Sequence, residues 1–157
     1  STEGDEPYHV EKEFKGKADW AGLDTRFLDR APHGLASALS FFSDEAFRFY
    51  LPAYLIAELQ GKLESSNPTF HLTHGLDDAS KRELINPRRY GGRTWFDHAR
   101  AKFAMFPREE VEAIVAYLQF KMATADLPSE KDSISQALDS YWEKRQQEAQ
   151  PRVALYD

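Results

Sequence analysis

Two histidines and two aspartates lie close together near the middle of the chain. They are His71, His74, Asp77 and Asp78. Imidazole nitrogens and carboxylate oxygens are ligands of zinc and other metals, so this group could supply a metal site. Histidines three residues apart share a face on a helix but point to opposite sides of a strand. Gly75 and the alternation of Phe70 with Leu72 favour the strand. We therefore expect no metal and no cofactor, with His71 and His74 as the residues that would hold a metal.

A hydrolytic site is an alternative use of the same region. It would be assembled across loops from His71, His74, Asp77, Asp78 and His98. Asp97 precedes His98, but neighbouring residues of a helix point about 100° apart, so their adjacency does not make a catalytic dyad. The chain has no Gly-x-Ser-x-Gly nucleophile elbow. Because catalytic triads assemble across space, the missing motif leaves this alternative open.

A second group combines arginines with an aromatic ring. It consists of Arg88, Arg89, Tyr90 and Arg93. Arginine and aromatic residues carry much of the binding energy at protein interfaces, and arginine presents a planar fork to carboxylates. We predict these four residues as partner-binding. The competing interpretation places Trp95 in the core and uses the arginines to cover acidic helices of the same chain.

Charge is unevenly distributed along the sequence. The formal net charge is −6, but residues 81–108 hold eight basic and two acidic residues, a net charge of +6, which leaves −12 elsewhere. An acidic protein is a poor default partner for nucleic acid, because phosphate binding needs a positive surface. The basic segment either folds against acidic helices of its own chain or binds a partner.

Length and composition indicate an ordinary globular protein. The chain has 157 residues, of which 41% are hydrophobic and 29% charged, which is typical of one domain. Without cysteine it has no disulfide, no catalytic thiol and no thiolate-bound zinc. No apolar run approaches the roughly 20 residues needed to span a bilayer. We expect a cytoplasmic protein with no membrane partner, and the oligomeric state stays open.

The elements predict a mainly α, single-domain helical bundle over residues 20–157, preceded by a polar arm over residues 1–19. Ser43 is the cap of a helix that meets Pro52. Since proline inside a helix costs about 3 kcal/mol, we predict a break at Leu51 and a new helix from Pro52 to about Leu63. A single kinked helix is the alternative.

The second half of the chain carries clearer helix signals. One short strand or hairpin is expected near residues 68–76, and a loop spans residues 86–92. Thr94, Pro107 and Ser129 each begin a helix. In the last two of these helices, apolar residues recur every three or four positions and therefore share one face. The polar end of the last helix, residues 143–150, is expected to project into solvent.

Three segments resemble a family of small bacterial proteins of unknown function. They are Trp20-Ala-Gly-Leu23, the segment from Ala38 to Leu55 with its Phe-x-Phe-Tyr-Leu-Pro-Ala-Tyr-Leu core, and Arg100-x-x-Phe-x-x-Phe-Pro-x-Glu-Glu110. The resemblance covers most of residues 20–122. It implies a bacterial, single-domain, mostly helical protein, and it supplies no activity, cofactor or site residue. The helix after Leu127 and the long loop lie outside it.

The sequence thus favours a non-enzymatic module that binds another protein. One concrete version is an immunity-type protein that masks a toxin, since such proteins are small, often acidic and free of cofactor motifs. The hydrolase described above is the alternative. A structural component that dimerises through a Phe-rich surface is the third interpretation.

Overall fold

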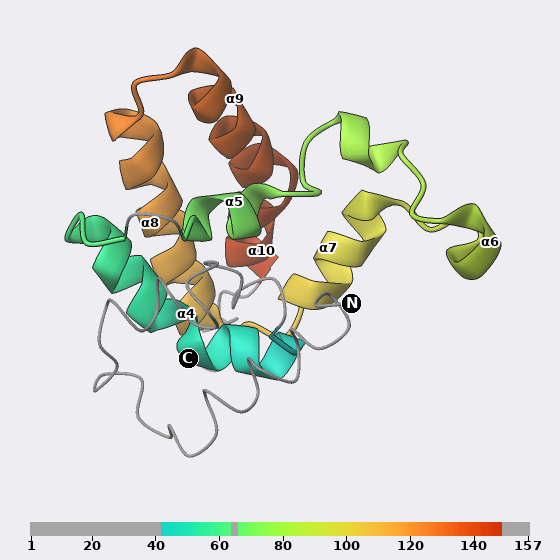
Figure 1. The fold of residues 1–157 in the computed structure, drawn as a ribbon, viewed down its shortest axis with the longest axis horizontal. Coiled ribbons are helices and arrows are strands. Elements are labelled where there is room, and N and C mark those ends of the chain that lie inside the picture. Colours follow the sequence, from blue (N-terminus) through green and yellow to red (C-terminus); the bar gives the residue numbers. More distant parts are fainter. Residues whose placement is uncertain (1–41, 64–65, 149–157) are drawn as a thin grey trace, which may run out of the picture. The chain divides into compact units, whose positions relative to one another are not determined.

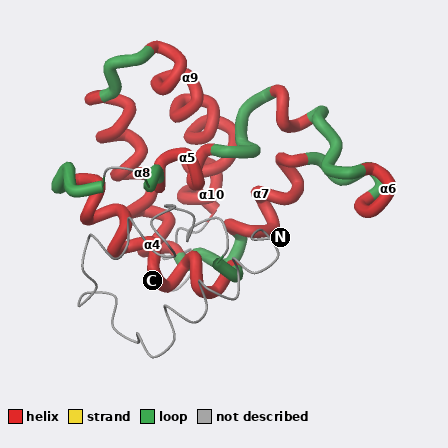
Figure 2. The backbone as a smooth tube through the Cα atoms, viewed as in Figure 1, coloured by secondary structure: helices red, strands yellow, loops and turns green. Residues whose placement is uncertain are grey.

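The computed structural model describes residues 42–63 and 66–148, and this part of the chain is mainly α-helical (Figures 1 and 2). The chain divides into two compact units, residues 1–71 and residues 72–157, and each is considered by itself. The predicted polar arm over residues 1–19 and the first part of the predicted bundle, residues 20–41, lie outside the described residues. No helix within residues 42–63 or 66–148 is both long enough and apolar enough to cross a membrane.

The first unit is built on helix α4, Asp44–Leu59, which contains Pro52 without interruption. The predicted break at Leu51 is therefore wrong, and the alternative of one continuous helix is confirmed. Proline removes one hydrogen bond at a cost of about 3 kcal/mol. Burying a large apolar side chain contributes about 1.5–3 kcal/mol. The helix buries side chains on both sides of the proline, and together they outweigh that cost: Phe47, Tyr50, Leu51, Ala53, Tyr54 and Ala57.

The start of α4 follows its sequence signals. The Ser43 hydroxyl accepts a hydrogen bond from the Ala46 amide at 3.2 Å, as predicted. Tyr54 is fully buried and Tyr50 nearly so. The Phe42 ring lies 5.3 Å from that of Tyr50 and 6.4 Å from that of Tyr54. Burial raises the pKa of Tyr50. These rings form structural core, as the sequence suggested.

Residues 68–73 are helical, so the strand or hairpin expected near residues 68–76 is wrong. Helix α5 spans Pro68–Thr73. Pro68 is suited to the first position of a helix, and the Asn67 side chain accepts from the Phe70 amide at 3.0 Å. This local start outweighs the apolar alternation of Phe70 and Leu72. Within the described residues, β pairing is confined to an isolated antiparallel bridge between Leu84 and Thr94.

The second unit contains the remaining elements. They are η2 (Ala79–Lys81), α6 (Pro87–Tyr90), α7 (Trp95–Phe103), α8 (Arg108–Thr124), α9 (Pro128–Ala137), the π-helical turn η3 (Leu138–Trp142) and α10 (Glu143–Glu148). Helix α8 packs against α9, η3 and α10, while α7 packs against η2. Figure 1 shows α9 continuing through η3 into α10, so the predicted last helix has its π turn in the middle.

Aromatic rings form the core of the second unit. Trp142 is fully buried, and its ring centroid lies 4.8 Å from that of Phe103, 5.0 Å from that of Tyr141 and 6.0 Å from that of Phe106. Its indole N–H donates to the Leu72 carbonyl at 2.8 Å. This bond ties the C-terminal end of the unit to its first residue.

The turn after α5 depends on Gly75. Its φ of +85° is in the region that side chains rarely adopt. An added Cβ would lie 3.1 Å from the Trp95 carbonyl oxygen and 3.2 Å from the Ala99 Cβ. The backbone of this turn therefore approaches α7 so closely that a side chain here would have to displace its neighbours slightly.

Helix α7 begins with a complete capping box. The Thr94 hydroxyl accepts from the Asp97 amide at 3.1 Å, and the Asp97 carboxylate accepts from the Thr94 amide at 3.1 Å. These bonds, with the nearby charges of Arg100 and Arg93, lower the pKa of Asp97. The predicted role of Thr94 as a cap is confirmed.

The lowered pKa of Asp97 leads to a prediction on pH. A carboxyl with a lower pKa in the folded than in the unfolded state stabilises the fold above the unfolded value, and this contribution is lost as the pH falls through the folded value. We expect Asp97→Asn to be less stable than the wild type at pH 7, with the gap closing below about pH 3.9. Urea unfolding of both proteins across this pH range measures the difference in their stability. The exposed Asp126→Asn is the matched control, and an equal gap for both variants would contradict the assignment.

Candidate functional site

The predicted partner-binding residues lie on one projecting segment, residues 84–94, which we name the arginine hairpin. The Leu84–Thr94 bridge closes its base. The Ile85 amide donates to the Arg93 carbonyl at 3.0 Å, and the Trp95 amide donates to the Glu83 carbonyl at 3.0 Å. The predicted loop over residues 86–92 therefore has a hydrogen-bonded base and a short helix, α6, at its tip.

The tip of the arginine hairpin is solvent-exposed throughout. Every residue from Asn86 to Arg93 is exposed. The Arg89 guanidinium lies 5.3 Å from the centroid of the Tyr90 ring, and Tyr90 is 44% exposed. Figure 1 shows α6 at the end of the segment, away from α8, α9 and α10 of the same unit. The hairpin thus brings the four predicted residues to one place in the fold.

The ion pairs of the basic segment are local. Lys81 pairs with Asp78 at 3.4 Å, and Arg108 pairs with Glu112 at 3.0 Å. Among the residues described, neither Arg88, Arg89 nor Arg93 forms an ion pair. The competing interpretation, in which these arginines cover acidic helices of the chain, gains no support from residues 42–63 and 66–148.

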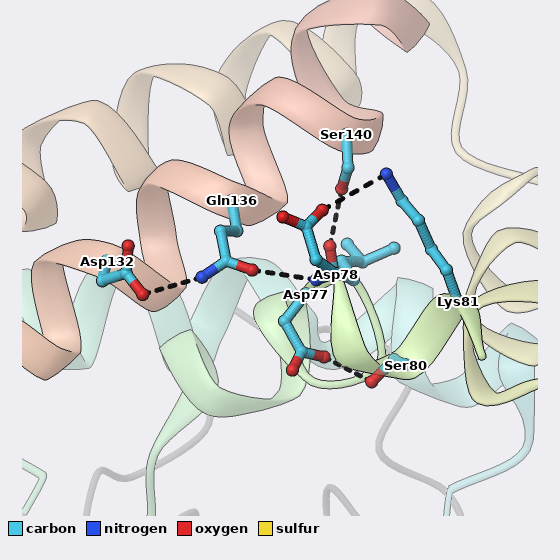
Figure 3. Close-up of polar contacts among 8 residues, drawn as sticks. Asp77, Asp78, Ser80, Lys81, Asp132, Gln136 and Ser140 are labelled. Atoms are coloured by element: carbon cyan, nitrogen blue, oxygen red, sulfur yellow. Dashed lines mark hydrogen bonds and ion pairs between the residues drawn. The ribbon is translucent and has the colours of Figure 1, made fainter. Parts of the chain in front are cut away.

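Asp77 and Asp78 belong to a structural network that fixes the turn before η2 (Figure 3). The Ser80 hydroxyl donates to the Asp77 carboxylate, and the Asp78 amide donates to the Gln136 side-chain oxygen at 2.8 Å. Gln136 donates in turn to Asp132 at 2.7 Å. The network attaches the turn to α9, so the two aspartates have local structural roles.

The candidate histidines are distributed over both units. His71 belongs to the first unit, where its ring lies 6.4 Å from that of Phe47 and 5.5 Å from that of Phe70. In the second unit the rings of His74 and His98 lie 5.6 Å and 6.2 Å from that of Trp95. Within the described chain, no group of three or more histidine or acidic side chains is placed to hold a metal ion. The hydrolase alternative therefore gains no support.

A pocket of about 310 Å³ in the second unit was not predicted. We name it the basic pocket. Its walls are formed by four basic residues, one acidic residue, two aromatic rings and a serine: Lys81, Arg100, Lys144, Arg145, Glu148, Phe96, Tyr141 and Ser140. The volume is at the lower end of the range for small-molecule sites.

Tyr141 is the most buried ionisable residue of this pocket. The residue is 8% exposed, and its hydroxyl has no hydrogen-bond partner of ordinary geometry in the described structure. Burial raises the pKa of Tyr141, while the positive charges of Arg145 and Arg100 oppose that rise. The charges of both guanidinium groups therefore act on the hydroxyl, and all three residues line the pocket.

The sequence carried a signal for the basic pocket. Phe96 and Arg100 are four residues apart on α7, and Tyr141, Lys144, Arg145 and Glu148 recur at three and four residues on η3 and α10. Residues at these spacings share a helix face. The polar end of the last helix, residues 143–150, was expected to project into solvent. Within its described part Lys144 and Glu148 are exposed, but Arg145 is half-buried and donates to the Phe106 carbonyl at 3.2 Å.

Comparison with known proteins places the chain in a family. No curated protein and no solved structure was found to match it. A family model described as a family of unknown function (DUF6714) matches residues 6–146. This range includes the loop and the helix after Leu127, which the resemblance based on sequence motifs left outside. The chain therefore belongs to the DUF6714 family, whose function is unknown.

Proposed function

We propose that the chain is a non-enzymatic module that binds an acidic surface of another protein through the arginine hairpin. The observation that carries the proposal is the solvent exposure of residues 86–93 together with the lack of ion pairs for Arg88, Arg89 and Arg93 among the described residues. The charges of Arg88 and Arg89 and the Tyr90 ring are thereby available at the tip, and Arg93 adds a third charge at the base.

The internal contacts of the arginine hairpin support a role in binding a partner rather than a simple connecting role. The backbone bonds at its base hold the two ends together, and the Arg89–Tyr90 cation–π contact restrains two of the side chains at the tip. Restraint before binding lowers the entropy lost on association. Arginine and tyrosine are enriched among residues that dominate binding energy. The positive charge of the arginines complements carboxylates on a partner surface.

An immunity-type role in a bacterial cytoplasm is the specific form of this proposal. In that form the partner is a toxin, and the hairpin covers an acidic patch on it. The support is compositional: a small acidic chain with no cysteine and a family without an assigned function.

The proposal predicts that charge reversal on the hairpin weakens partner binding. We expect Arg88→Glu/Arg89→Glu to weaken binding about tenfold, with the wild-type interaction also weakening as salt is raised. The measurement is affinity capture from the native host, identification of the stoichiometric partner, and titration of the purified partner against both proteins.

The matched control carries the same charge change elsewhere. Lys62→Glu/Lys131→Glu reverses two exposed lysines outside the hairpin and is expected to bind the partner as the wild type does. The absence of any stoichiometric partner, or an equal loss in both double variants, would contradict the proposal.

A further inference from the structure

The basic pocket has a strongly positive lining in an acidic protein. Among the described residues, the lining holds Lys81, Arg100, Lys144 and Arg145 against one carboxylate, that of Glu148, and Asp78, outside the lining, pairs with Lys81. Bringing four cations together is unfavourable unless an anion is bound there or solvent screens them. The chain as a whole carries a net charge of −6, so this concentration of positive charge is a local feature.

An aromatic ring positions Lys81 and Arg100, two of the four lining cations. The Lys81 ammonium lies 5.3 Å from the centroid of the Phe96 ring, and the Arg100 guanidinium lies 5.7 Å from it. Such contacts hold cations in place without neutralising them. Lys81 also pairs with Asp78, whose amide is bound to Gln136 of α9 (Figure 3). The position of Lys81 is therefore fixed from two sides.

The second arginine is fixed by the backbone. Arg145 donates through Nη2 to the Phe106 carbonyl at 3.2 Å and to the Ala104 carbonyl at 3.4 Å. A guanidinium has five N–H groups in a rigid fork, so these two bonds orient it and leave other donors for an anion. The buried Tyr141 hydroxyl, which makes no hydrogen bond of ordinary geometry with the described residues, interacts with the charge of this group. A ligand oxygen bound beside Arg145 would give the buried Tyr141 hydroxyl an acceptor for its hydrogen bond, which is favourable.

We propose that the basic pocket binds a small molecule that carries a phosphoryl group. Phosphate takes two negative charges near neutral pH and offers three oxygens to donors that converge from several directions. A single carboxylate would satisfy fewer of the four cations. The pocket volume of about 310 Å³ suits a small organic phosphate. This inference is independent of the arginine hairpin and of the partner proposed for it.

The test is calorimetric titration of the full chain at low salt with inorganic phosphate, phenyl phosphate and benzoate. We expect saturable binding of phenyl phosphate and at least about tenfold weaker binding of benzoate, since the carboxylate forms fewer charged hydrogen bonds. Tighter binding of phenyl phosphate than of inorganic phosphate assigns the site to an organic phosphate. The reverse order assigns it to free phosphate.

Variants connect the binding to the pocket. Arg100→Gln and Lys144→Gln are each expected to weaken phenyl phosphate binding about tenfold. Glu148→Gln, which removes the opposing charge, is expected to tighten it. Arg82→Gln, an exposed residue that does not line the pocket, is the matched control and should leave the affinity unchanged. Lys144 is exposed, so this variant tests the site even where another substitution affects folding.

Three results would overturn the proposal. The first is the absence of saturable binding of either phosphate at millimolar concentration. The second is an equal loss of affinity in the Arg82→Gln control. The third is displacement of phenyl phosphate by single-stranded RNA at equal phosphate concentration, which would make the region a nucleic-acid surface. Partner capture by the arginine hairpin is measured separately, so failure of one proposal does not affect the other.

Discussion

Replacing Trp142 with alanine is expected to lower the free energy of unfolding by about 3–5 kcal/mol. The side chain is fully buried and contacts the rings of Phe103, Phe106 and Tyr141. Its removal leaves a large cavity, and it also leaves the Leu72 carbonyl without the indole donor. Urea unfolding followed by far-UV circular dichroism measures the change.

Two further variants separate the contributions to this loss. Trp142→Phe keeps an aromatic ring but removes the indole N–H, so a smaller loss of about 1–3 kcal/mol is expected. Phe120→Ala removes a ring that is 52% exposed on α8 of the same unit and should change stability by less than about 1 kcal/mol. Equal unfolding midpoints for Trp142→Ala and Phe120→Ala would contradict the central role of this indole.

Gly75→Ala is expected to destabilise the protein by about 2–3 kcal/mol. Roughly 1–2 kcal/mol arises from placing a side chain at a left-handed φ of +85°. The remainder arises because the new Cβ meets the Trp95 carbonyl oxygen at 3.1 Å and the Ala99 Cβ at 3.2 Å. Thermal and urea unfolding of the variant test this directly.

Other glycines of the chain serve as graded controls. Gly61 has a φ of +69° but nothing within 4 Å of an added Cβ, so Gly61→Ala should cost about 1 kcal/mol. Gly92 has neither feature, and Gly92→Ala should be within about 0.5 kcal/mol of the wild type. If Gly75→Ala costs no more than Gly61→Ala, the close approach to α7 has no energetic consequence.

Capping side chains and proline predicted where several helices begin. Ser43 and Thr94 accept from amides one turn on, as their side chains and the acidic residues after them indicated. Pro107 directly precedes α8, because its fixed φ suits a helix start. These signals depend on residues within one turn of each other, so they can be read without knowledge of the fold.

The two errors have different causes, one in distant contacts and one in a local cap. Pro52 remains inside α4 because side chains on both sides of it are buried, and a sequence does not state what will cover them. Phe70 and Leu72 alternate as in a strand, yet the cap by Asn67 and Pro68 starts a helix. Tertiary burial and a specific cap each outweighed a pattern.

For the candidate site, too, the local arrangement was predictable from the sequence and the tertiary packing was not. The four residues of the arginine hairpin are adjacent in sequence, so their proximity was evident, although the Leu84–Thr94 bridge was not. The basic pocket joins Lys81, Arg100 and Arg145 from three separate elements. Each pair within one helix face is visible in the sequence, but the packing that joins the faces is not.

The π turn η3 has a consequence for the residues that follow it. The Glu143 amide donates to the Leu138 carbonyl, five residues earlier, so this turn holds one residue more than an α-helical turn closed by a bond to the fourth residue back. A chain one residue shorter between Leu138 and Trp142 would rotate everything after it by about 100°. Lys144 and Arg145 would then leave the pocket wall. The extra residue therefore sets the angular register of the C-terminal helix, and a deletion there would move two of the four lining cations out of the wall without altering a single charge.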